Sequence, residues 1–342
     1  MNYSLDDIRS ILSRKHKLPV ETENSLMDLR IFVLSHSIPS QKRGLLWKLL
    51  LRVNEISAKC YISLVHRGPS LMDSKIRNDT FRTMTTDENF LEQVSEDMLI
   101  RVLNAFVWIS SSDGKELDTP EELRYRSKFI GWFPEAGLTY VQGMNVLVAP
   151  FLMVMPEMEA FYAFSNFMWR WCPLYIQPNL KGVHSGIKLL DMCLKMLDPQ
   201  LYYLLLSKGF TANMYAIPSV MTFCACTPPS KELLLLWDVM FAFGLHLNIL
   251  FIIAQLALIR KDLMASSSPM KLLRKLPSLQ AEKIIKITLS SIKQLPPDLY
   301  EKLVRHAYDE SVADSLGIQL SAGVSQSEDL HRLPPYLAEA LL

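Results

Sequence analysis

The sequence predicts an all-α fold with little or no β-sheet, and three observations support this prediction. Apolar residues recur at spacings of three and four over most of the 342 positions. Runs of alternating apolar and polar residues, which are typical of strands, are few, and the chain holds only 12 glycines. Hydrophobic residues make up 49% of the chain, enough for a sizeable core. Because no internal repeat and no clear linker divides the pattern, we expect one large domain.

The first predicted helices lie in the N-terminal third of the chain. Ser4 and Asp7 have the spacing of a capping box, and Ile8 and Ile11 follow on one helix face. Amphipathic spacing continues over residues 25–36, 43–53 and 90–109. We therefore expect an N-terminal arm over residues 1–24, with the domain starting at residue 25.

A polar insertion over residues 110–139 interrupts the helical pattern, and we predict that it is a surface loop. One short helix is expected within it, because Thr119 suits an N-cap and Pro120 suits the first helical position. Two glutamates follow in the first turn, where negative charge favours a helix.

Helical patterns resume after residue 140. A helix over residues 141–155 is expected to kink at Pro150, and Pro199 is expected to separate two helices. Further helices are predicted over residues 158–172, 231–243, 268–276 and 296–308. Beyond residue 309 the periodicity is lost. The domain therefore spans residues 25–310 in this interpretation, and residues 311–342 form a C-terminal tail.

The stretch over residues 239–259 has no formal charge and is long enough to span a bilayer. Gly244, His246, Asn248 and Gln255 interrupt it, however, and a break near the glycine into two buried helices explains it better. We therefore predict no transmembrane segment and a hydrogen-bonded core histidine at position 246. A membrane-anchored regulator is kept as an alternative.

The net charge indicates which class of partner to expect, and the cysteine content indicates the cellular compartment. The 36 Lys and Arg residues nearly balance the 35 Asp and Glu residues, so the net charge of +1 gives no field for nucleic acid, and no nucleic-acid partner is expected. Five scattered cysteines and a polar, acidic start without a signal peptide favour reduced thiols in the cytoplasm.

Common catalytic and cofactor motifs are absent from the sequence. No phosphate-binding loop, dinucleotide fingerprint, Gly-x-Ser-x-Gly or His-Glu-x-x-His pattern occurs. Cys224 and Cys226 form a single pair with the wrong spacing for a zinc ribbon, and buried thiols are the better interpretation. We therefore expect no metal and no cofactor bound by this chain itself.

The stretch "KIRNDTFRT" places Ile76, Asp79 and Arg82 at i, i+3 and i+6. In a helical segment the isoleucine can anchor the helix, and the aspartate can pair with a nearby base or cap a turn. The arginine then lies at the end of a supported element. Taken alone, an exposed arginine that pairs with Asp79 or Asp87 is the more common outcome.

The stretch "YVQGMN" places Gln142 at the junction of a loop and a helix, where side chains are exposed but positioned. A glutamine amide can orient a water molecule, and Gly143 permits close backbone approach. Alone, this glutamine would simply satisfy backbone groups at a helix start. Together with Arg82 it suggests activation of a GTPase: the arginine neutralises charge on the transferring phosphoryl group and the glutamine orients the attacking water.

The chain resembles the TBC-domain family of GTPase-activating proteins for Rab-type GTPases. Four stretches carry the resemblance, in the family's order: "RGLLW" from Arg43 to Trp47, "IRNDTFRT" from Ile76 to Thr83, "YVQGM" from Tyr140 to Met144 and "LWD" from Leu236 to Asp238. They span most of residues 25–310. Two stretches differ from the common family pattern, at residues 137–139 and at residues 215–219.

The resemblance implies an all-α domain with two catalytic fingers, Arg82 and Gln142, which enter the site of a Rab-like small GTPase. It gives supporting roles to Asp79, Tyr140, Gly143 and Ile76, and structural roles to Arg43, Trp47, Trp237 and Asp238. GTP and Mg²⁺ then belong to the partner GTPase, and the chain is an activator rather than an enzyme with its own substrate.

Within the family, the chain looks most like the subunit that acts in mitotic-exit and septation signalling. That resemblance implies a two-component activator with a separate scaffold subunit, and a cytoplasmic protein recruited to the spindle pole body. It also implies a restraint on mitotic exit or septation. The alternative function is a non-catalytic scaffold that binds a small GTPase or a spindle-pole partner.

Overall fold

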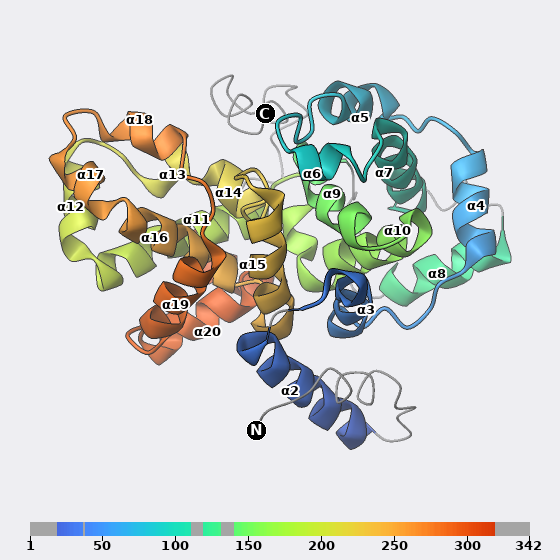
Figure 1. The fold of residues 1–342 in the computed structure, drawn as a ribbon, viewed down its shortest axis with the longest axis horizontal. Helices are drawn as coiled ribbons and strands as arrows, with labels where there is room; N and C mark the ends of the chain where they lie inside the picture. Colours follow the sequence, from blue (N-terminus) through green and yellow to red (C-terminus); the bar gives the residue numbers. More distant parts are fainter. Residues whose placement is uncertain (1–18, 37, 111–118, 131–139, 319–342) are drawn as a thin grey trace.

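A computed structural model describes residues 19–36, 38–110, 119–130 and 140–318 of the chain (Figure 1). These residues form helices joined by turns and loops, and they include no strand. The predicted all-α class is therefore confirmed. The predicted N-terminal helix after Ser4 lies outside the described residues.

The first half of the domain contains the segments of Arg82 and Gln142. Its helices are α2 Pro19–Ser35, α3 Ser40–Leu50, α4 Ala58–His66, α5 Asp73–Thr80, α6 Glu88–Leu91, α7 Glu96–Ser110, α8 Pro120–Ile130, α9 Met144–Val154 and α10 Glu157–Asn166. Figure 1 shows α4 to α10 gathered on one side of the molecule, with α2 extending away from the body.

The second half begins with a π-helical turn, η1 Phe167–Trp171, and a short 3₁₀ turn, η2 Pro173–Tyr175. Its helices are α11 Lys181–Leu197, α12 Pro199–Ser207, α13 Ala212–Tyr215, α14 Ile217–Met221, α15 Ser230–Phe243, α16 Leu247–Leu258, α17 Arg260–Ala265, α18 Pro269–Arg274, α19 Ala281–Ile292, α20 Pro297–Arg305 and α21 Glu310–Ser315. Helix α15 lies between the two halves and packs against α2, α3, α16 and α19 (Figure 1).

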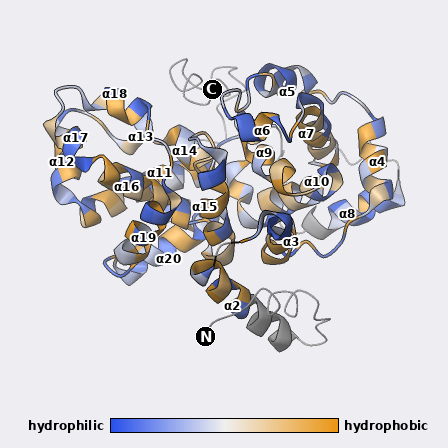
Figure 2. Ribbon diagram, in the orientation of Figure 1, coloured by the Kyte–Doolittle hydropathy of each residue, from blue (hydrophilic) through white to orange (hydrophobic). Residues whose placement is uncertain are grey.

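The core between the halves is aromatic. The rings of Trp47, Phe151, Phe167, Trp237 and Phe241 pack with centroids 5.0 to 6.0 Å apart. They come from α3, α9, η1 and α15, so this cluster packs the two halves of the domain against each other. Figure 2 shows hydrophobic residues in α15, in the middle of the molecule, whereas α5 at its edge is mostly hydrophilic. Burial of such large side chains is a major favourable term in the folding free energy.

The breaks after α11 and α15 agree with the sequence. Asp198 and Pro199 separate α11 from α12, and the Asp198 carboxylate caps α12 by accepting from the Leu201 amide at 3.1 Å. Gly244 separates α15 from α16 with a φ of +130°, which only glycine adopts readily. His246 is buried and bonds the Tyr300 hydroxyl at 3.0 Å, as predicted. None of the helices in the described ranges is long and apolar enough to cross a bilayer.

The prediction of one helix over residues 90–109 is wrong. The chain forms α6 and α7 instead, because two short polar side chains cap separate helix starts. The Asp87 carboxylate accepts from the Phe90 amide at 3.0 Å, and the Ser95 hydroxyl accepts from the Met98 amide at 3.3 Å. Val94 in the break remains buried, so the apolar pattern continues across it.

The prediction of a surface loop over residues 110–139 is wrong for its helical part. Helix α8 is capped by Thr119 as predicted, at 3.2 Å from the Glu122 amide, but it packs against α4 and α7. Tyr125 is buried against Tyr162, with ring centroids 4.8 Å apart. The amphipathic face of this short helix therefore belongs to the core. The rest of the insertion lies outside the described residues.

Helix α21 follows Asp309, where the sequence pattern predicted no further helix. It packs against α11 with Val312 and Ala313 buried, and the Asp309 carboxylate caps it at 2.9 Å from the Ser311 amide. Its six residues are too few to show helical periodicity, which explains the missed prediction.

Candidate functional site

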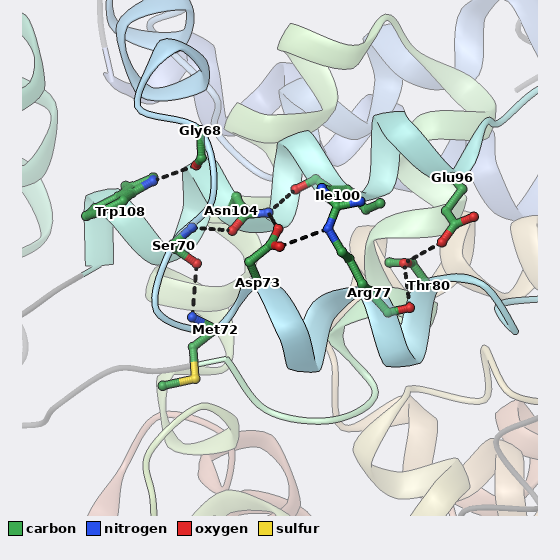
Figure 3. A network of polar contacts seen from close by, with 10 residues as sticks. All are labelled: Gly68, Ser70, Met72, Asp73, Arg77, Thr80, Glu96, Ile100, Asn104 and Trp108. Atoms are coloured by element: carbon green, nitrogen blue, oxygen red, sulfur yellow. Dashed lines mark hydrogen bonds and ion pairs between the residues drawn. The ribbon is translucent and has the colours of Figure 1, made fainter.

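Helix α5 presents the first motif and is held at its start by an asparagine. Asn104 on α7 donates to the Asp73 carboxylate at 2.8 Å and accepts from the Ser70 amide at 2.8 Å (Figure 3). Ile76 is fully buried and anchors the helix against its neighbours, as predicted. Near the end of α5, the Thr80 hydroxyl donates to Glu96 on α7 at 3.2 Å.

Arg82 lies just after α5 and pairs with Asp79, the pairing that the sequence suggested. One terminal nitrogen of the guanidinium, Nη2, is 2.8 Å from Asp79 Oδ1. The Tyr140 hydroxyl donates to the other oxygen, Oδ2, at 2.8 Å. The alternative partner Asp87 is engaged elsewhere, because its carboxylate accepts from the amide and hydroxyl of Ser230. Asp79 therefore joins the two motifs that are about 60 residues apart in the chain.

The Asp79–Tyr140 bond is protected from water. Both residues are buried, whereas 31% of the Arg82 side chain is exposed. Burial, reinforced by the Asp79 carboxylate, raises the pKa of the Tyr140 hydroxyl well above its ordinary value. The hydroxyl therefore stays protonated and remains a hydrogen-bond donor across the physiological pH range.

Gln142 lies in a tight turn immediately before α9. Gly143 takes a φ of +101°, and a Cβ atom there would lie 3.2 Å from the Met221 side chain and 3.4 Å from the Thr222 side chain. The turn therefore favours glycine through its backbone conformation more than through lack of space. The Gln142 side chain is partly exposed, and its amide makes no hydrogen bond with another residue in the described ranges.

Asn145 connects the Gln142 turn to the arginine segment. Its Oδ1 accepts from the Gly143 amide at 3.1 Å, and its Nδ2 donates to the Thr83 hydroxyl at 2.8 Å and to the Asp79 carbonyl at 3.3 Å. The Thr83 hydroxyl in turn donates to the same Asp79 carbonyl at 3.0 Å. Asn145 and Thr83 are both buried.

Sequence reasoning did not identify Asn145 or Thr83 as site residues. The available signal was a polar residue that opens the otherwise apolar run "MNVLVAPFLMV" of α9. A buried asparagine must satisfy its amide, so its presence there indicated a partner without naming it.

The other two motif stretches meet in a separate, fully buried cluster. Arg43 Nε lies 3.0 Å from both oxygens of Asp238, and Trp47 Nε1 donates to the same carboxylate at 2.7 Å. Trp237 donates to the Phe223 carbonyl at 2.9 Å. These contacts join α3 to α15, and the cluster shares no hydrogen bond with Arg82.

A cavity of about 700 Å³ opens beside the two motif segments. Met84 and Val146 line one wall, two residues after Arg82 and one residue after Asn145. Residues of α13, α14 and α18 and of the segments beside them also line the cavity, and they include Tyr215 from the stretch that differs from the family pattern. Residues that follow the two motif segments and residues of the second half therefore line the same hollow.

The described residues contain no cluster of three or more His, Cys, Asp or Glu side chains that could hold a metal ion. None of the five cysteines forms a disulfide bond. Cys224 is buried, and its thiol contacts Asn248 Oδ1 at 3.1 Å, as expected for a core thiol. Burial raises the pKa of Cys193 to about 12, which makes that thiol unreactive.

The sequence that contains these motifs matches a known family. The sequence profile of the Rab-GTPase-TBC domain matches residues 40–264 of this chain. The chain belongs to the RabGAP-TBC family. The resemblance that the four motif stretches indicated is therefore confirmed, and the family implies a small GTPase as the partner.

Two related proteins match nearly the whole chain. The chain is 41% identical over 310 residues to Cell division control protein 16 of Schizosaccharomyces pombe, covering 89% of this chain and 95% of that protein. It is 37% identical over 305 residues to Mitotic check point protein BUB2 of Saccharomyces cerevisiae, covering 86% of this chain and 95% of that protein.

A solved structure supports the fold. The crystal structure of the Ypt/Rab-GAP domain of Gyp1p superimposes with a TM-score of 0.63 and covers 86% of this chain and 98% of that one. The sequences are only 17% identical, so the likeness concerns the fold alone.

Proposed function

We propose that this RabGAP-TBC protein activates a Rab-like small GTPase with two fingers supplied in trans, Arg82 and Gln142. One observation carries the proposal: both side chains project from segments that a single buried network joins through Asp79, Tyr140 and Asn145. The exposed ends of the two fingers therefore start from a fixed base. Such positioning is what transition-state stabilisation requires.

In this proposal Arg82 enters the nucleotide site of the GTPase and hydrogen-bonds phosphate oxygens. Among the residues that the structure describes, Asp79 engages one terminal nitrogen of the guanidinium, which leaves most of its donors available to a ligand. The contact strengthens as negative charge builds on the transferring phosphoryl group, and such arginines lower the barrier by about 4–7 kcal/mol. Lysine cannot replace it, because a planar fork rather than a point charge bridges the oxygens.

Gln142 places the attacking water in the same proposal. A neutral amide can accept a hydrogen bond from the water through its oxygen and donate one to a phosphate oxygen through its nitrogen at the same time. Tyr140 and Gly143 shape the turn that presents the amide. GTP and Mg²⁺ are bound by the partner GTPase, and this chain contributes no cofactor.

The cell process follows from the relatives rather than from the site. Because two relatives are named for cell division control and for a mitotic check point, we propose that the chain restrains mitotic exit or septation. As a finer part of the proposal, the chain is one subunit of a two-component activator with a separate scaffold subunit. It acts in the cytoplasm and is recruited to the spindle pole body.

Single-turnover hydrolysis of GTP by a septation-type Rab-like GTPase tests the two-finger proposal. The assay compares the parent with Arg82→Ala and Gln142→Ala, with and without the scaffold subunit, and measures GTPase binding in parallel. We expect both substitutions to abolish the acceleration while binding survives. If both variants accelerate hydrolysis as well as the parent does, the protein is instead a scaffold that holds its partners together.

A further inference from the structure

The two fingers are joined by more than the Asp79–Tyr140 bond. The Asn145 side chain makes hydrogen bonds with both ends of the site: its carbonyl oxygen holds the Gly143 amide, and its amide nitrogen holds Thr83. Gly143 is the residue after Gln142, and Thr83 is the residue after Arg82. One buried side chain therefore touches the immediate neighbour of each finger.

The chemistry of this position favours asparagine specifically. The Gly143 amide needs an acceptor, whereas the Thr83 hydroxyl, which donates its proton to the Asp79 carbonyl, can only accept from the Asn145 position. A side-chain amide supplies one of each, while a carboxylate has no donor and an aliphatic side chain has neither. Because Asn145 lies at the start of α9, a rigid helix fixes the position of this link.

We infer that Asn145 is a positioning residue that sets the spacing between Arg82 and Gln142. This inference rests on the proposed function of the two fingers and deepens it. Asn145 does not touch the GTPase or its nucleotide; it acts through the two segments that it joins. Helix α5 is then fixed at both ends by buried asparagines, with Asn104 at its start (Figure 3) and Asn145 at its end.

Three variants isolate the link from general damage to the fold. Asn145→Ala removes the link, and Thr83→Val removes the hydroxyl that accepts from it while nearly preserving volume. Asn166→Ala is the matched control, because Asn166 is an equally buried asparagine that donates to the Leu51 carbonyl and contacts neither finger segment. Single-turnover hydrolysis is measured over a range of activator concentrations, and unfolding is followed for each variant.

We expect Asn145→Ala and Thr83→Val to slow hydrolysis at saturating activator by about 10- to 100-fold, because small displacements of catalytic groups have effects of that size. The half-saturating concentration should change by less than about threefold, since the loss concerns the transition state rather than binding. The double variant should be no slower than the slower single variant, because each single variant already lacks the Asn145–Thr83 hydrogen bond. Asn166→Ala should stay within about twofold of the parent although it loses stability.

Two results would overturn the inference. If Asn145→Ala is no slower than Asn166→Ala at saturation, the link is only structural. If the effects of Asn145→Ala and Thr83→Val multiply in the double variant, the two residues act separately. Failure of the function itself is distinguishable, because then Arg82→Ala and Gln142→Ala also leave the acceleration intact.

Discussion

Two regions of this protein use the same three chemical groups for different ends. In each, an aspartate accepts from an arginine and from an aromatic side chain: Arg82, Asp79 and Tyr140 in one, and the Arg43–Trp47–Asp238 cluster in the other. In the buried cluster the arginine side chain is 9% exposed, against 31% for Arg82.

The two regions differ in how the aspartate oxygens are shared between the arginine and the aromatic side chain. Asp238 holds Arg43 through Nε with both oxygens, and the surrounding core excludes solvent. Asp79 gives Arg82 one oxygen and reserves the other for Tyr140, and 31% of the Arg82 side chain remains exposed. One arrangement is suited to join helices, and the other is suited to present an arginine to a partner.

Substitution of each arginine by lysine should separate these two uses most strongly. We expect Arg82→Lys to lower the rate of activated hydrolysis by at least about 1,000-fold, because lysine lacks the bidentate fork, while the free energy of unfolding changes by less than about 1 kcal/mol. We expect Arg43→Lys to do the reverse, lowering stability while the folded protein still activates. Hydrolysis assays and urea unfolding of both variants measure this. Equal loss of activity in both variants would contradict the distinction between a catalytic arginine and a structural one.

Loss of the carboxylate should affect stability more in the buried cluster. Asp238→Ala leaves the Arg43 charge buried without its partner, and we expect a cost of about 3–5 kcal/mol. Asp79→Ala leaves Arg82 able to reach water, and we expect about 1–3 kcal/mol, mainly from the unpaired Tyr140 hydroxyl. Chemical denaturation gives both values. A cost for Asp79→Ala that equals or exceeds that of Asp238→Ala would contradict this account.

The pH dependence of stability should combine two buried histidines in the second half with Asp238, which acts in the opposite direction. Burial raises the pKa of Asp238 to about 6, so at this carboxyl the folded chain binds more protons than the unfolded one as the pH falls below 6, and this contribution alone raises stability. Burial lowers the pKa of His246 and of His306 to about 4, so at these rings the unfolded chain binds more protons than the folded one as the pH falls below 6.5. The two histidines should therefore each lower the free energy of unfolding by about 3 kcal/mol between pH 6.5 and 4, and together they outweigh the opposing contribution of Asp238.

Unfolding measured at several pH values, in the parent and in His306→Gln, checks this prediction. The neutral His306 ring accepts from the Tyr175 hydroxyl at 2.8 Å and bonds the Leu303 carbonyl at 2.6 Å, and glutamine can offer both a donor and an acceptor there. The variant should show a shallower decline. An unchanged decline would mean that other groups cause the acid sensitivity.

The smallest expected effects come from removing single tyrosine hydroxyl groups. Tyr140→Phe and Tyr61→Phe each remove one hydrogen bond to a carboxylate that also pairs with an arginine, since Tyr61 donates to Glu157 at 2.7 Å beside Arg101. Each should cost about 1–2 kcal/mol of stability. Only Tyr140→Phe should also slow activated hydrolysis. A similar slowing in Tyr61→Phe would indicate that general loosening, rather than the finger network, is responsible.

Local features of the fold were predictable from the sequence. The helix stop at Pro199, the break at Gly244 and the cap at Thr119 each depend on neighbouring residues, so a short window of sequence contains the cause. The all-α class follows in the same way from the helical spacing of apolar residues. Two errors, at Ser95 and in α21, concern short elements whose pattern is too brief to read. The third, the burial of α8, depends on its packing against α4 and α7, which are distant in the sequence from it or from each other.

The sequence indicated two candidate fingers but not the contacts that connect their segments. The motif spacing indicated Arg82 and Gln142, and the pairing of Arg82 with Asp79 is local. The links from Tyr140 and Asn145 to the α5 end cross more than 60 positions of the chain, and only the packing of α9 against α5 brings them together. No local rule encodes a hydrogen bond of that range.

The most direct test of the central claim is binding to a transition-state mimic. The GTPase is loaded with GDP and aluminium fluoride, and its affinity for the parent protein is compared with the affinity of the GDP form. We expect at least about 100-fold tighter binding to the aluminium fluoride form, lost in Arg82→Ala and in Gln142→Ala, because the fingers bind the transition state preferentially. Equal affinity for both forms, or a preference that survives both substitutions, would contradict the account.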